Sequence, residues 1–153
     1  ADAKILYMIR DPLNVIPSGL SLVTGVLDKR FGFWELSEEK RSHFINRLYH
    51  GLVQLLLRFH SDWTNNKIDK SKVMIIPFDR MMGDFDNLMQ EILEFTEHNI
   101  SLELEEDIKS TALKQKEFQS GHKYDLEKFG LTEEKIRSDC SVIYETFINN
   151  KSR

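Results

Sequence analysis

The chain has 153 residues and a net charge of −4, and 41% of its residues are hydrophobic while 30% are charged. This composition is typical of one globular domain, and the negative charge argues against a nucleic-acid binder held by a general basic field. The single cysteine, Cys140, cannot form an internal disulfide, and no apolar run approaches the roughly 20 residues of a membrane span. The compartment stays undetermined, with a cytoplasmic location favoured over the others.

Two short apolar runs predict strands of a parallel sheet. Residues 4–10 and 72–77 are nearly continuous in apolar residues rather than alternating, which is typical of strands covered on both faces. No third strand is evident, and two strands alone would leave edges unpaired and apolar faces bare. We therefore expect the sheet to continue in sequence outside the chain, with residues 1–153 forming the C-terminal part of a single domain.

The rest of the sequence predicts mostly helix. Asp11 is a favourable N-cap, and Pro12 is a favourable first residue of a helix. This helix is expected to reach about Leu27 with a bend at Pro17. A second, longer helix is predicted after Ser37, because apolar residues recur there at every third or fourth position. Further helices are predicted at about 84–98, 102–118 and 132–149. This order of elements indicates an α/β fold with parallel strands and a mostly helical remainder.

The carboxyl ends of the two strands are the expected ligand site, because ligands bind there in open α/β sheets. Arg10 leaves the first strand where a helix N-terminus begins, so its guanidinium and free backbone N–H groups suit an anion. Ser18 follows on that helix, and its hydroxyl is a further donor to a phosphate oxygen. The alternative is that Arg10 pairs with a surface carboxylate and Ser18 only contacts a neighbouring helix.

Three segments resemble, in the same order, segments of the sulfotransferases that use 3′-phosphoadenylyl sulfate. The strand with Arg10-Asp11-Pro12 and Ser18 is similar to the family's 3′-phosphate-binding strand and helix. Residues 73–81 are similar to the strand that ends in Tyr-Glu-Asp-Leu in the family. Residues 122–134 resemble a C-terminal segment of the bacterial-type and tyrosylprotein-like branch. The resemblance implies the C-terminal part of a P-loop kinase-like three-layer fold.

The resemblance also implies roles for particular residues. Arg10 and Ser18 would contact the 3′-phosphate of the donor, and Lys123, with His122 beside it, would close over the same phosphate. Phe78 would also lie at the nucleotide, but it stands where many relatives have tyrosine, which removes a possible hydroxyl contact. The implied enzyme moves a sulfuryl group from 3′-phosphoadenylyl sulfate, its co-substrate, to an unidentified acceptor hydroxyl or amine without a metal ion.

The chain departs from the family in two respects. The phosphosulfate-binding loop and the catalytic base lie upstream of the Arg-Asp-Pro segment in the family, and neither is found here. We therefore assign no catalytic residue. We expect the chain alone to be inactive, with the N-terminal half of the domain as its partner.

Two other functions stay open from the sequence. The first is a nucleotide or small-molecule kinase of the same fold, disfavoured because no Walker lysine or magnesium carboxylate can be assigned. The second is a non-catalytic helical interaction module. Phe31, Phe33 and Trp34 follow the first helix, where an acceptor or adenine could stack, although core packing is the favoured interpretation.

Overall fold

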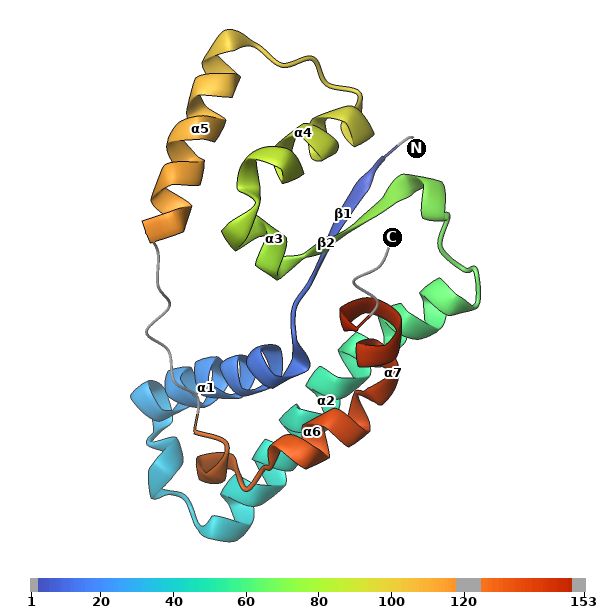
Figure 1. The fold of residues 1–153 in the computed structure, drawn as a ribbon. Helices are drawn as coiled ribbons and strands as arrows, with labels where there is room; N and C mark the ends of the chain where they lie inside the picture. Colours follow the sequence, from blue (N-terminus) through green and yellow to red (C-terminus); the bar gives the residue numbers. More distant parts are fainter. Residues whose placement is uncertain (1–2, 118–124, 150–153) are drawn as a thin grey trace. The chain divides into compact units, whose positions relative to one another are not determined.

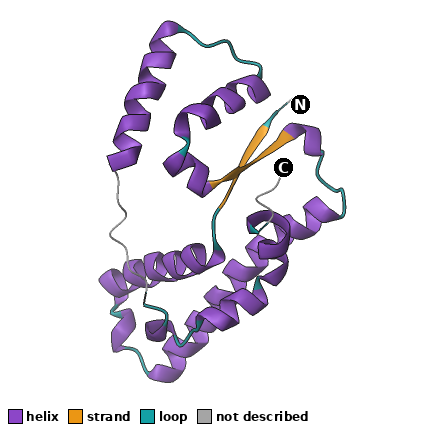
Figure 2. Ribbon diagram, in the orientation of Figure 1, coloured by secondary structure: helices purple, strands orange, loops and turns teal. Residues whose placement is uncertain are grey.

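The computed structural model describes residues 3–117 and 125–149, and the chain divides into two compact units (Figure 1). The first unit is made of residues 1–10 and 66–121, and the second of residues 11–65 and 122–153. Within the described residues, both strands lie in the first unit, whereas the second unit is built from helices (Figure 2). No helix in this described part is both long and apolar enough to cross a membrane.

The first unit contains a two-stranded parallel sheet, as predicted. β1 (Ile5–Ile9) and β2 (Val73–Pro77) pair in parallel over their full length. The expectation that both faces are covered is not met within the described residues, because Ile5, Leu6 and Met8 are 52%, 44% and 47% exposed. These side chains leave apolar surface on β1 in contact with solvent.

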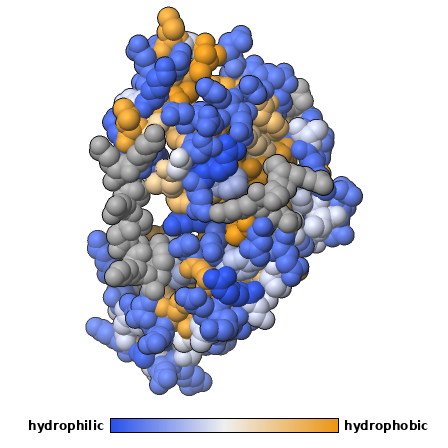
Figure 3. Space-filling model, in the orientation of Figure 1, coloured by the Kyte–Doolittle hydropathy of each residue, from blue (hydrophilic) through white to orange (hydrophobic). Residues whose placement is uncertain are grey.

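Three helices follow β2 in the same unit: α3 (Phe78–Gly83), α4 (Phe85–Thr96) and α5 (Leu102–Glu117). α4 and α5 confirm two predicted helices to within a few residues at their ends. No helix was predicted for α3, because six residues are too few for a helical periodicity to register. Figure 3 shows apolar surface over α5, where Leu102 and Leu113 are 83% and 65% exposed.

The second unit begins with α1 (Pro12–Phe31), which is longer than predicted. Asp11 is its N-cap, since the carboxylate accepts a hydrogen bond from the Leu13 N–H at 2.8 Å. The helix ends at Gly32, which has a φ of 62° and donates its N–H to the Asp28 carbonyl. Glycine tolerates this left-handed conformation without strain, so the helix continues past the predicted end to the residue that can terminate it.

α2 (Glu38–Thr64) confirms the long predicted helix. The last predicted helix, over residues 132–149, is interrupted in the structure. The structure has α6 (Glu133–Asp139), a break at Cys140, and then α7 (Ser141–Ile143) leading into a π-helical turn. The prediction of one continuous helix over residues 132–149 is therefore wrong. No glycine or proline marks the break, so the sequence carries none of the usual signals for it.

Helices α1, α2, α6 and α7 bury the core of the second unit. Its members are fully or almost fully buried: Ile16, Leu20, Tyr49, Ile136, Cys140 and Ile143. A Cβ on Gly19 would lie 3.0 Å from a methyl group of Leu52, so the small residue permits the close approach of α1 and α2. Burial raises the pKa of the Cys140 thiol to about 11, so the thiol stays protonated and is a poor nucleophile.

Asp139 makes the stability of the second unit sensitive to acid. The Tyr49 hydroxyl donates to its carboxylate at 2.6 Å and the Lys135 ammonium lies at 3.1 Å, and these contacts lower the pKa of Asp139. Because the folded pKa is the lower one, the stabilisation is fully present above the unfolded pKa of about 4. It is lost as the pH falls through the folded pKa.

We therefore expect the wild type and Asp139→Asn to differ most in free energy of unfolding near pH 7. The difference should shrink as the pH falls below about 4, because the wild-type carboxyl becomes neutral there. Urea denaturation of both proteins across a pH series measures this, and the other carboxyl groups cancel in the comparison. A difference that stays constant down to pH 2 would contradict the assigned role of Asp139.

Candidate functional site

Arg10 and Phe78 meet at the carboxyl ends of the two strands in the first unit. The guanidinium carbon of Arg10 lies 4.2 Å from the centre of the Phe78 ring, a distance typical of a cation–π contact. Arg10 directly follows β1 and Phe78 directly follows β2. Because the strands are parallel and in register, these residues reach the same edge of the sheet although they are far apart in sequence. The structure thus brings together two of the predicted site residues.

The guanidinium of Arg10 has no polar partner within the described residues. Its ring contact with Phe78 occupies one face, and it forms no hydrogen bond or ion pair with any described side chain. The surface carboxylate that was the alternative interpretation of Arg10 is therefore not found there. Five N–H donors in a planar fork stay available, which is the geometry that suits a phosphate or sulfate group.

The N-terminus of α1, in the second unit, is fixed by two hydrogen bonds to one carboxylate. Oδ1 of Asp11 accepts from the Leu13 N–H and from the Tyr144 hydroxyl. Burial and the bond to Asp11 raise the pKa of Tyr144, so its hydroxyl stays protonated and continues to donate. The first turn of α1 carries no acidic side chain, so Asp11 at the N-cap is the carboxylate that faces the positive end of the helix dipole. The sequence predicts Asp11 as the cap but carries no local signal for the contact with Tyr144.

The remaining predicted site residues are Ser18, His122 and Lys123. Ser18 lies on α1 and is half-buried in the second unit, whereas Arg10 belongs to the first unit. Because each unit is described by itself, the pairing of Arg10 with Ser18 stays a prediction. His122 and Lys123 lie outside the described residues. After them, Phe129 and Leu131 are buried, and Thr132 caps α6.

The aromatic group after α1 is divided between core and surface. Phe33 is 3% exposed and belongs to the core, which was the favoured interpretation, whereas Phe31 is 74% exposed. Phe31 borders an apolar cavity of about 590 Å³ at the C-terminal end of α1. Its walls are formed by Leu27, Phe31, Phe33, Leu36, Glu39, Lys40, His43 and Phe44. Leu27 is about four turns, or roughly 22 Å, along α1 from Pro12, so this cavity is separate from the N-terminus of α1.

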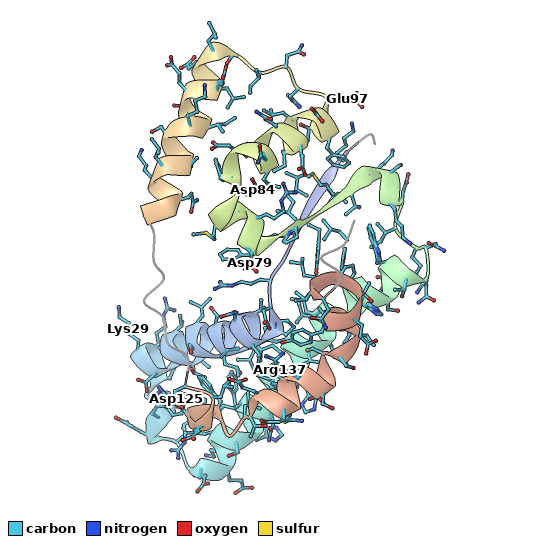
Figure 4. All side chains as sticks on the ribbon, viewed as in Figure 1. Lys29, Asp79, Asp84, Glu97, Asp125 and Arg137 are labelled. Carbon is cyan, nitrogen blue, oxygen red and sulfur yellow. The ribbon has the colours of Figure 1, made fainter. Side chains whose placement is uncertain are left out.

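No group of three or more histidine, cysteine or acidic side chains that could hold a metal ion occurs in residues 3–117 and 125–149. Two acidic side chains that follow β2, Asp84 and Glu91, are paired with one arginine. Arg80 binds Asp84 and Glu91 at 2.7 to 2.8 Å, and its hydrogen bonds lower the pKa of both carboxyl groups. Figure 4 labels Asp84, and also Asp79 of α3.

Comparison with known protein families finds a sulfotransferase domain over residues 1–143. The matched segment includes every predicted site residue from Arg10 to Lys123. Searches of curated proteins and of solved structures find no match. Since the domain match spans nearly the whole length of the sequence, the chain belongs to the sulfotransferase family.

Proposed function

We propose that the protein takes a sulfuryl group from 3′-phosphoadenylyl sulfate and that Arg10 and Ser18 hold the 3′-phosphate of this donor. The observation that carries the proposal is the Arg10 guanidinium, which is stacked on one face and free of polar partners among the described residues. It lies at the carboxyl end of a parallel strand in a chain of the sulfotransferase family. By resemblance alone, Lys123 and His122 complete the site by closing over the same phosphate.

The proposed reaction transfers the sulfuryl group to an acceptor hydroxyl or amine. The acceptor atom attacks sulfur and loses a proton to a base, while the bond from sulfur to the bridging phosphate oxygen breaks. Adenosine 3′,5′-bisphosphate then leaves with the electron pair. The residues that hold the 3′-phosphate do not touch the sulfur, and they act by fixing the donor so that the acceptor meets it in the reactive orientation. We assign no catalytic base in this chain.

We further propose that residues 1–153 are the C-terminal part of a larger sulfotransferase domain. This proposal is supported by the exposure of Ile5, Leu6 and Met8, because the strands of parallel sheets are normally covered on both faces. A sheet of two strands is also too small to be stable alone. Further strands would pair with the edges of this sheet, further helices would cover these side chains, and the rest of the domain would supply the phosphosulfate-binding loop and the base.

The proposed function is tested by calorimetric titration of adenosine 3′,5′-bisphosphate into the protein in the presence of EDTA. We expect a dissociation constant in the micromolar range, about −8 kcal/mol. Adenosine 5′-monophosphate is the matched ligand control, since it lacks only the 3′-phosphate, and it should bind at least about tenfold more weakly. Equal binding of the two nucleotides, or no binding of the bisphosphate, would overturn the proposal. Binding of ATP that requires magnesium would favour the kinase.

A further inference from the structure

The contact between Arg10 and Phe78 has a geometry that leaves the donors of the guanidinium free. A cation–π contact uses the face of the guanidinium, whereas its N–H groups point outward in the plane of the group. An arginine side chain has many rotamers, and fixing it in one of them opposes binding by up to about 2 kcal/mol. Stacking on an aromatic ring restricts Arg10 before any ligand arrives, so less of this entropy is lost on binding.

The position of Phe78 is fixed by the helix that it begins. It is the first residue of α3, a helix of only six residues that is tied to α4 through Arg80. The Arg80 guanidinium donates to Asp84 at 2.8 Å and to both carboxylate oxygens of Glu91 at 2.7 and 2.8 Å. A bidentate pair of this kind restricts orientation as well as distance. The ring therefore stands on a helix whose position is set by α4.

We infer that Phe78 is a positioning residue of the donor site: its ring orients the Arg10 guanidinium so that the N–H edge of Arg10 faces the 3′-phosphate. This inference rests on the proposed function and adds a role that acts through Arg10 rather than through the nucleotide. Phenylalanine cannot supply the hydroxyl contact that a tyrosine would supply. Its contribution to binding comes from the π face of the ring, which phenylalanine and tyrosine share.

The test measures the dissociation constant of adenosine 3′,5′-bisphosphate for a small set of variants. Phe78→Leu removes the ring without changing the charge, and we expect it to weaken binding about fivefold, or about 1 kcal/mol. Phe78→Tyr keeps the ring and should bind within about twofold of the wild type. Phe85→Leu is the matched control, because Phe85 begins α4 and lines a small apolar cavity in the same unit. It should also stay within about twofold.

A double-mutant cycle separates positioning from general loosening of the unit. If Phe78 acts through Arg10, Phe78→Leu should have no further effect in an Arg10→Ala background. Full additivity of the two substitutions, or equal losses in Phe78→Leu and Phe85→Leu, would overturn the inference. The proposed function would survive either result, because the wild type would still bind the bisphosphate. If the wild type does not bind, the proposed function fails first and the positioning role falls with it.

Discussion

Arg10→Ala is expected to weaken the binding of adenosine 3′,5′-bisphosphate by about 30-fold or more, corresponding to about 2 kcal/mol. Hydrogen bonds between an ionised donor and a phosphate each contribute about 1.5–3 kcal/mol, and the arginine fork can make two of them. The fold should not change, because Arg10 lies just after β1 and its side chain donates no hydrogen bond within the described residues. Circular dichroism and the thermal midpoint of each variant check this.

Two further variants show whether the effect belongs to the site. Arg58→Ala also removes one positive charge, from an α2 side chain that is 77% exposed, and it should bind within about twofold of the wild type. Arg10→Lys keeps the charge but loses the planar fork, so we expect an intermediate affinity. If Arg10→Ala and Arg58→Ala weaken binding equally, the nucleotide responds to net charge alone. The assignment of Arg10 to the 3′-phosphate would then be wrong.

The sequence predicted the parts of the fold that have a local pattern. Both strands are continuous apolar runs, and the long helix α2 carries a regular apolar stripe, so each was identified. The start of α1 was predicted from the Asp11-Pro12 pair. The family was also predicted from three ordered motifs, and the domain match confirms it. The branch of the family and the donor nucleotide stay proposals.

Features that depend on distant residues were not predicted. α3 is too short for a periodicity, and the break at Cys140 follows an ordinary helical sequence. The stacking of Arg10 on Phe78 depends on the register of two strands that are separated by the whole of α1 and α2. The sequence places both residues at the nucleotide. It does not predict that Arg10 and Phe78 contact each other. Only the paired strands show that they touch.

The sequence also left open which face of α1 is buried, and a pair of substitutions tests what the structure shows. Leu20 is completely buried in α1, whereas Leu22, two residues further on, is 69% exposed. Leu20→Ala should lower the free energy of unfolding by about 3 kcal/mol, because it removes buried methyl groups and leaves a cavity. Leu22→Ala should change it by less than about 0.5 kcal/mol.

The comparison isolates burial because both variants make the same substitution within one helix. Leucine and alanine differ slightly in helix propensity, and this difference is common to both variants. Urea denaturation followed by circular dichroism at 222 nm gives both free energies. A loss at Leu22 as large as that at Leu20 would mean that the exposed face of α1 is covered in solution. Additional protein surface would then pack on α1, and Leu22 would belong to a core larger than the one that this chain forms alone.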